Sequence, residues 1–179
     1  WQMLPYEKQL EYKQQQVHDQ LSRIAGVSIP DLMPIVGSAH RQYYRNKLEF
    51  TFSAQRYLTN EEIKAAAGAA LEPEPALGFH APGLFDKVVP IHTCYLQQEP
   101  TNKLLEVLSQ YTTTKGLDYY HFRDQKGWLR NVVLRIATTG EILINLILQH
   151  KDKKERTALL DHILQHIPSI TSLHYTINP

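Results

Sequence analysis

Hydrophobic residues recur along the chain with two different periods, and these periods predict the secondary structure. Spacings of three, four and seven residues predict amphipathic helices, whereas alternation predicts half-buried strands. Helical spacing occurs in three long segments, 6–25, 100–112 and 153–167. Alternating or short apolar runs occur at 44–53, 76–80, 86–91, 128–138, 142–149 and 171–177. This order of elements predicts an α+β fold, with helices packed on a mostly antiparallel sheet.

The segment 55–75 is rich in alanine and proline, and this composition predicts a surface excursion between two strands. Thr59-Asn60-Glu61-Glu62 can cap a short helix, which Pro73 and Pro75 would end. The alanine-rich face of this helix could bury little apolar surface.

Segments 128–138 and 142–149 predict the clearest hairpin. Even-numbered aliphatic residues of both segments must share one face, and a three-residue loop Thr139-Gly140-Glu141 satisfies this requirement. Gly140 can adopt the positive φ that such loops need. The expected partners are Ile136 with Ile144, Leu134 with Leu146, Arg135 with Asn145, Val133 with Ile147, and Asn131 with Gln149.

Composition places the chain among ordinary globular domains. It has 179 residues, of which 42% are hydrophobic and 21% charged, so residues 1–179 can form one domain with a sizeable core. No run approaches the roughly 18 apolar residues of a membrane span, and no membrane association or signal peptide is expected. The single cysteine favours a reducing, cytoplasmic environment. A net charge of +1 means that any nucleic-acid contact must use a local patch.

The segment 40–47 is the first candidate for such a patch. Arg41, Arg45 and Lys47 are interspersed with two tyrosines and Asn46, a combination that can contact phosphates and stack on bases. Equally, cations of this kind can protect a solvated strand edge. Arg45 and Lys47 are expected to share a strand face with Glu49, which would partly neutralise Lys47 and leave Arg45 as the stronger phosphate contact.

A second candidate follows Trp128. Arg130 lies at the mouth of the predicted strand, and Asn131 and Arg135 share one of its faces. The alternative is structural: these arginines could pair with Glu49 or another carboxylate across the sheet.

Cysteine and histidine give weaker signals. Cys94 follows His92 closely, but a lone cysteine is usually a small buried hydrophobe. His162 and His166 have a spacing seen in zinc sites, yet no third ligand is evident. No phosphate-binding loop, dinucleotide fingerprint or catalytic triad stands out, so no catalytic residue is assigned.

Four motifs occur in an order that resembles the central domain of RNA uracil-5 methyltransferases, especially the branch that modifies 23S ribosomal RNA. They are Tyr44-Arg45-Asn46-Lys47-Leu48-Glu49-Phe50, Leu77-Gly78-Phe79-His80, Ile91-His92-Thr93-Cys94-Tyr95-Leu96 and Leu129-Arg130-Asn131-Val132-Val133-Leu134-Arg135. The resemblance spans the whole chain. It implies a central RNA-binding domain between an N-terminal oligonucleotide-binding barrel and a C-terminal methyltransferase domain, both absent from these residues.

The resemblance also implies cofactors and roles. Family members use S-adenosylmethionine, and many hold an iron–sulfur cluster on four cysteines, of which Cys94 would supply the fourth. The catalytic cysteine belongs to the methyltransferase domain, so the chain alone is expected to be inactive, with Cys94 a free thiol near the surface. RNA contacts are expected from Arg41, Arg45, Asn46, Lys47, His80, Arg130, Asn131 and Arg135.

Expected partners are ribosomal RNA and neighbouring domains of the same longer protein. Two alternatives come from other classes: a stand-alone RNA-binding or assembly factor, and a small metal-dependent hydrolase built on His162 and His166.

Overall fold

A computed structural model describes residues 3–69, 71–72 and 74–179. The chain divides into two compact units, Trp1–Arg41 and Gln42–Pro179. None of the helices in the described part of the chain is long and apolar enough to cross a membrane.

The first unit is a helix followed by an extended return segment. Helix α1 (Tyr6–Asp19) continues into a π-helical turn, η1 (Gln20–Ile24), which confirms the helix predicted over 6–25. Pro5 precedes it, and Gly26 ends it at a φ of 65°. The return segment is tied back by hydrogen bonds, including Ser38 N–H to the Tyr6 hydroxyl at 2.6 Å.

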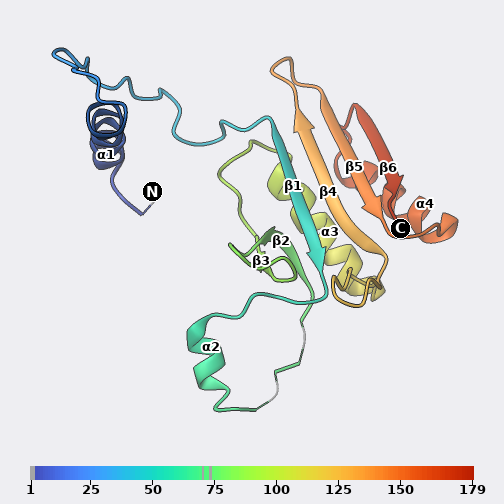
Figure 1. Cartoon of the computed structure of the whole chain (residues 1–179). Coiled ribbons are helices and arrows are strands. Elements are labelled where there is room, and N and C mark those ends of the chain that lie inside the picture. Colours follow the sequence, from blue (N-terminus) through green and yellow to red (C-terminus); the bar gives the residue numbers. More distant parts are fainter. Residues whose placement is uncertain (1–2, 70, 73) are drawn as a thin grey trace. The chain divides into compact units, whose positions relative to one another are not determined.

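The second unit is built on one six-stranded sheet in the order β3-β2-β1-β4-β5-β6 (Figure 1). Its strands are β1 (Lys47–Ser53), β2 (Ala76–His80), β3 (Val88–Pro90), β4 (Leu129–Ile136), β5 (Ile142–Leu148) and β6 (Ser172–Ile177). All neighbours are antiparallel except β5 and β6, which are parallel. The expected α+β class with a mostly antiparallel sheet is therefore confirmed, and the sheet is mixed.

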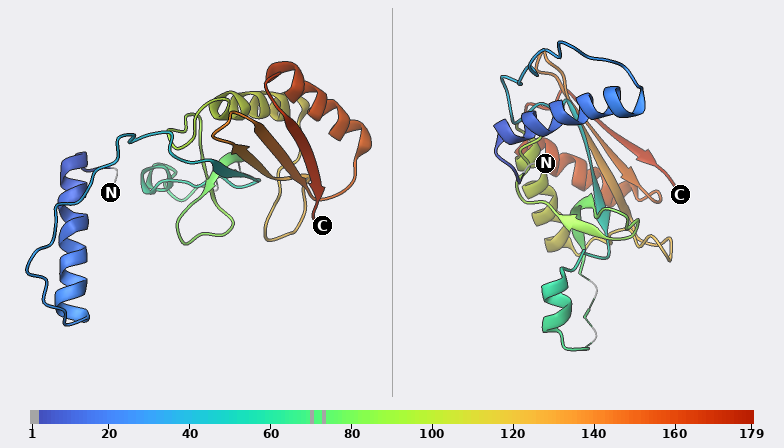
Figure 2. Two further views of the ribbon diagram at one scale, coloured as in Figure 1. Left: turned by 90° about the horizontal axis from the view of Figure 1, so that it is seen from above. Right: turned by 60° about the vertical axis from the view of Figure 1, so that its left-hand side comes forward.

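Two helices, α3 (Thr101–Lys115) and α4 (Lys153–His166), cover the same face of this sheet (Figures 1 and 2). The core lies between these layers. Strand residues on the covered face are fully buried or nearly so: Leu48, Phe50, Phe52, Val132, Leu134, Ile136, Ile142, Ile144, Leu146 and Leu148. Leu104, Leu108, Leu159 and Ile163 meet them from the helices. The predicted aliphatic face is confirmed, and no helix in the described part of the second unit covers the opposite face.

The register of the β4–β5 hairpin differs from the prediction by two residues. Ile136 pairs with Ile142, Leu134 with Ile144 and Arg135 with Leu143. Val133 pairs with Asn145, and Asn131 with Ile147. The loop has three residues, but it is 138–140, closed by Ala137 N–H to the Glu141 carbonyl at 2.9 Å.

The position of Gly140 explains the shift. Its φ is 101°, as expected, but it is the last loop residue and not the central one. Three-residue hairpin loops commonly place the positive-φ residue last. A two-residue shift keeps every side chain on its predicted face.

Strand β1 begins at Lys47, so the prediction that it starts at 44 is wrong, and Arg45 precedes the strand. The segment before it instead follows residues 95–96, through Tyr43 N–H to the Tyr95 carbonyl and Arg45 N–H to the Leu96 carbonyl, both 2.8 Å.

The excursion between β1 and β2 contains α2 (Asn60–Ala65), none of whose described residues is buried. The predicted capping box is present: Thr59 and Glu62 bond each other's backbone N–H. α2 already ends at Ala65, and Pro73, which was expected to end it, lies outside the described residues. Arg56 joins the two ends of the excursion by ion pairs with Glu62 and Glu74, both at 2.8 Å.

Candidate nucleic-acid interface

The uncovered face of the sheet gathers several residues that the sequence singled out. Lys47 of β1 pairs directly with Arg135 of β4, and Thr51 pairs with Asn131. We call the residues Lys47, Glu49, Thr51, Asn131, Val133 and Arg135 the uncovered central face; Lys47, Glu49 and Arg135 are exposed and Asn131 and Val133 half-buried, whereas Thr51 is buried. Strand alternation places these side chains opposite the buried core residues.

Electrostatics make the Lys47 end of this face positive. Lys47 Nζ lies 3.8 Å from Glu49 Oε2, and both side chains are about half exposed, so the expected partial neutralisation of Lys47 is confirmed. Arg135 is exposed, and within the described chain no hydrogen bond or ion pair involves its side chain. Like charges directly opposite in a sheet are destabilising. An anionic ligand would relieve this repulsion.

A groove of about 360 Å³ lies beside Arg135, where β4 ends and β1, β5 and β6 begin. Asn46 contributes to it, and the Asn46 carbonyl accepts a hydrogen bond from Ile136 N–H at 2.9 Å. Its lining is Asn46, Arg135, Ile136, Ala137, Glu141, Ile142, Leu143, Thr171 and Ser172. The structure thus brings Asn46, Lys47 and Arg135 together.

Arg130 and Asn131 are more constrained. Arg130 lies at an irregularity in the β4–β5 register and donates to Gln149 Oε1 at 2.6 Å and to the Asn178 carbonyl at 3.0 Å. Its guanidinium carbon lies 4.1 Å from the centre of the Tyr120 ring. Asn131 donates to Thr51 Oγ1 at 3.1 Å. The expected carboxylate partners are not found in the described residues; amide, carbonyl, hydroxyl and aromatic groups take their place.

The remaining predicted contacts are dispersed. Arg45 is exposed, and its side chain has no partner among the residues described. Arg41 belongs to the first unit, where it pairs with Glu7 at 3.3 Å and lies 4.2 Å from the Tyr6 ring centre. His80 is exposed at the end of β2, with its ring 5.3 Å from that of Phe122. RNA contact by these residues stays a prediction.

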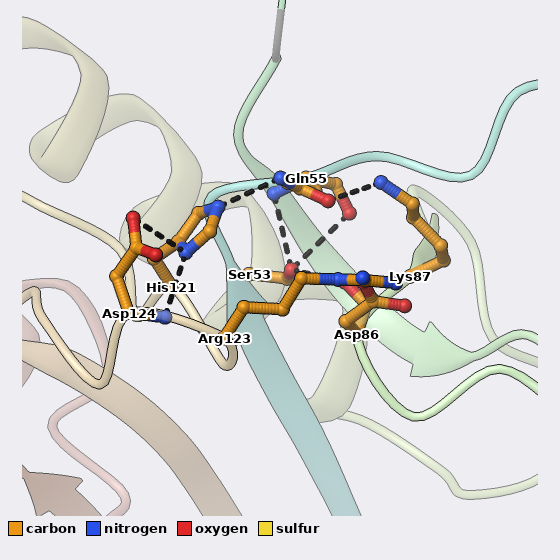
Figure 3. Close-up of polar contacts among 7 residues, drawn as sticks. All are labelled: Ser53, Gln55, Asp86, Lys87, His121, Arg123 and Asp124. Carbon is orange, nitrogen blue, oxygen red and sulfur yellow. Dashed lines mark hydrogen bonds and ion pairs between the residues drawn. The ribbon is translucent and has the colours of Figure 1, made fainter.

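A polar cluster that no sequence pattern predicted lies where a loop, 118–127, meets the end of β1 and the start of β3 (Figure 3). Arg123 Nε lies 2.5 Å from Asp86 Oδ2, and Gln55 Nε2 lies 2.7 Å from His121 Nε2. Lys87 donates to the Gln55 side-chain oxygen.

Asp86 is the buried member of this cluster. Its carboxylate is 5% exposed, whereas the Arg123 side chain is 64% exposed. The hydrogen bond from Arg123 holds the pKa of Asp86 below its usual range, against the opposing effect of burial. Asp86 and Arg123 are 37 residues apart, and no periodicity links them. The loop is thereby fixed with an exposed cation beside the strands.

The predicted surface position of Cys94 is wrong. Cys94 is 3% exposed and belongs to the core, because Asn102 of α3 bonds both its backbone N–H, at 2.7 Å, and its carbonyl, at 3.3 Å, and so draws the segment inward. An iron–sulfur cluster does not fit the donor set, since Cys94 is the chain's one cysteine and could supply a single ligand. The described residues contain no group of three or more acidic, histidine or cysteine side chains placed to hold a metal.

His162 and His166 likewise form no metal site in the described part of the chain. Their rings lie 4.1 Å apart, and His162 contacts Tyr111 at 4.5 Å between ring centres. Burial, and then the neighbouring His166, lower the pKa of His162. The pair lines the outer groove between α3 and α4, and the metal-dependent hydrolase has no third ligand there.

Comparison with solved structures identifies the class of fold. No model of a known protein family matches the chain. The fold is that of part of a crystal structure of Pyrococcus abyssi tRNA (uracil-54, C5)-methyltransferase in complex with S-adenosyl-L-homocysteine, with a TM-score of 0.64. Sequence identity is 21%, and the match covers 99% of this chain and 36% of that one. At this identity the likeness establishes the fold alone.

Sequence relatives are more informative. The chain is 41% identical over 181 residues to a protein of Bacteroides thetaiotaomicron and 39% identical over 181 residues to one of Porphyromonas gingivalis, each described as an uncharacterized RNA methyltransferase. A protein of Chlorobaculum tepidum with the same description is 38% identical over 170 residues. These matches cover 99%, 99% and 94% of this chain but 39%, 39% and 35% of the relatives. The chain therefore spans well under half the length of the curated relatives it matches, and it is similar to one segment of them.

Proposed function

We propose that the chain is the RNA-recognition domain of an RNA methyltransferase. The observation that carries this proposal is the uncovered central face, where Lys47 and Arg135 lie directly opposite each other. The relatives, described as RNA methyltransferases, match over almost the whole chain, which supports an RNA substrate. Their greater length favours an internal domain over a stand-alone RNA-binding factor.

The finer assignment is an S-adenosylmethionine-dependent uracil-5 methyltransferase acting on 23S ribosomal RNA in the cytoplasm. The structural neighbour supports the reaction class, because it is described as a uracil-C5 methyltransferase in complex with S-adenosyl-L-homocysteine, the product left when S-adenosylmethionine gives up its methyl group. That neighbour is described as a tRNA methyltransferase, so the ribosomal substrate rests on the motif series around Tyr44 and Leu129. Methylation of ribosomal RNA and of tRNA transcripts by the longer protein would separate these substrates.

Within this proposal the chain binds and orients RNA, and a neighbouring domain transfers the methyl group. No catalytic residue is assigned here: a nucleophilic thiolate must reach the uracil ring, and Cys94 is enclosed in the core. A cluster held with the help of Cys94 would need three further cysteines from neighbouring segments, together with a local rearrangement that exposes this thiol. We therefore derive no step through such a cluster.

The test is a titration of the chain with single-stranded ribosomal RNA fragments across a salt series. Affinity is expected in the range of non-specific binding, about 10–100 μM. Arg135→Gln and Arg45→Ala should each weaken binding and lower the salt slope by about 0.7–0.9 per lost phosphate contact. Lys47→Ala should have a smaller effect than Arg45→Ala, because Glu49 already partly neutralises Lys47.

Lys154→Ala is the matched control, since Lys154 is an exposed cation on α4, the helix layer of the sheet. Arg135→Gln also removes a like-charge contact, so its free energy of unfolding should hold or rise while its affinity falls. If all four variants bind with the wild-type affinity and slope, the uncovered central face is a solvated surface and the proposal is wrong.

A further inference from the structure

Two exposed tyrosines, Tyr43 and Tyr95, lie together at the start of the second unit. Their side chains are about half exposed, and their ring centres lie 6.4 Å apart with planes tilted by 49°. Exposed aromatic pairs are unusual on a surface that has no ligand for them, because burying either ring would be favourable.

The backbone beneath these rings is fixed in place. Tyr43 N–H donates to the Tyr95 carbonyl at 2.8 Å, and Arg45 N–H donates to the Leu96 carbonyl at 2.8 Å. On the other side, the Asn102 side chain bonds both the N–H and the carbonyl of Cys94, immediately before Tyr95. Tyr95 is therefore anchored to α3, and Tyr43 is anchored to Tyr95.

Tyr43 adopts a φ of 56°, the left-handed region that non-glycine residues rarely occupy. Such strain persists only where surrounding contacts enforce it, and it clusters at ligand sites. Here the enforced conformation places a large aromatic ring beside a second one.

The charge of the segment indicates the kind of ligand. Arg45 follows Tyr43 by two residues, and its exposed side chain has no partner in the described chain. The uncovered central face adds Arg135, whose side chain also has no partner there, and Lys47, which Glu49 partly neutralises. Aromatic faces beside unpaired cations suit a single-stranded nucleic acid, whose bases stack while its phosphates meet the cations. The ring separation is about twice the 3.4 Å spacing of stacked bases, so a rotation of the rings that removes their 49° tilt would admit one base between them.

From this geometry we infer that Tyr43 and Tyr95 form a stacking site for one unpaired nucleobase of the RNA. This inference rests on the proposed RNA-binding function and adds a contact that discriminates single-stranded from duplex RNA. Neither tyrosine hydroxyl is needed for stacking, so the ring itself is the binding group.

The experiment compares three RNA probes of equal length: an oligouridylate, an oligomer with abasic sites and a duplex. Tyr43→Ala and Tyr95→Ala should each weaken oligouridylate binding by roughly fivefold to a hundredfold, the effect of losing one stacked base. Binding of the abasic and duplex probes, and the salt slope for all three, should not change. Tyr43→Phe and Tyr95→Phe should retain wild-type affinity because they keep the ring.

Tyr43→Gly tests whether a loss of oligouridylate affinity could arise from misfolding. Glycine accepts the positive φ without strain, so this variant should be at least as stable as the wild type and should still lose oligouridylate affinity. Tyr175→Ala is the matched control, because Tyr175 is similarly exposed but lies on the helix-covered side of β6, against Arg156.

Three results would overturn the inference in distinguishable ways. If the wild type binds the oligouridylate and the tyrosine variants behave like Tyr175→Ala, the stacking site is wrong and the RNA-binding function stands. If the variants lose affinity for the duplex and abasic probes as well, the tyrosines do not read bases. If the wild type binds none of the probes, the proposed function itself fails.

Discussion

At the scale of single residues, the arginines fall into two groups. Some bind other protein groups and stabilise the fold, and others are exposed and can bind a ligand. Arg130, Arg123 and Arg56 are each engaged by protein groups in fixed geometry. Arg45 and Arg135 are exposed and have no side-chain partner within the described residues. All five are arginines, so composition could not make this distinction; only the partners supplied by the fold make it.

Asp86 permits a residue-scale prediction. Its pKa is lowered in the folded protein, chiefly by the Arg123 hydrogen bond, so the carboxylate contributes stability above the unfolded-state pKa of about 3.9 and loses it as pH falls through the folded-state value. Asp86→Asn should reduce the free energy of unfolding at pH 7 by about 1–2 kcal/mol, moderated by the exposure of Arg123.

Denaturant unfolding at pH 7 and pH 3 measures this difference. The difference in free energy of unfolding between wild type and Asp86→Asn should narrow at pH 3, because this pH lies below the unfolded-state pKa and unfolding then takes up a proton at Asp86. Asp118→Asn is the control and should change little at either pH, because Asp118 is an exposed carboxylate in the same loop whose side chain has no hydrogen bond or ion pair within the described residues. If the difference in free energy of unfolding is equal at both pH values, the packing of the Asp86 side chain, and not its charge, stabilises the loop.

At the scale of elements, the β4–β5 hairpin shows that the turn determines the strand register. Hydrophobic alternation restricted the pairing to registers that keep Ile136 and Ile144 buried, and both are buried. Alternation cannot distinguish registers two residues apart, since each keeps the same faces. The required place of the positive-φ residue in a three-residue loop decided between them.

Gly140→Ala tests the importance of that loop geometry. The backbone φ of 101° is unfavourable for alanine, although space for its Cβ is open, so conformational strain should be the whole effect. We expect a loss of about 1–2 kcal/mol in the free energy of unfolding. Thr138→Ala, in the same loop, is the matched control, because Thr138 is exposed and its side chain has no hydrogen bond within the described residues. An unchanged midpoint in denaturant would mean that the hairpin tolerates another turn and that Gly140 does not set the register.

At the scale of the whole molecule, every residue of the described core belongs to the second unit, from Leu48 to Ile177. Of α1 and η1 in the first unit, both fully described, no residue is buried. Isolated helices of this length are marginal in water. Stability should therefore reside in Gln42–Pro179.

The predicted consequence is that Gln42–Pro179 folds alone. Its free energy of unfolding should match that of the full chain within about 0.5 kcal/mol, the usual scale for changes away from a core. Denaturant unfolding followed by Trp128 fluorescence is a suitable measurement, because Trp128 is buried in the second unit and Trp1 is removed with the first. A markedly less stable truncated chain would contradict this division.

The sequence by itself determined the elements, the burial of alternate strand positions and the polarity of the uncovered face. These properties follow from local spacing, since side-chain direction repeats every two residues in a strand and about every 3.6 in a helix. For the same reason the cations Lys47 and Arg135 could be assigned to exposed strand faces before their neighbours were known.

Only the tertiary structure decided which distant residues meet. It paired Lys47 with Arg135, joined Asp86 to Arg123, and set Tyr43 beside Tyr95. It also drew Cys94 into the core through Asn102, against the surface position expected from its motif. Strand order and loop packing fix such encounters, and because they depend on contacts between segments far apart in the chain, no local pattern encodes them.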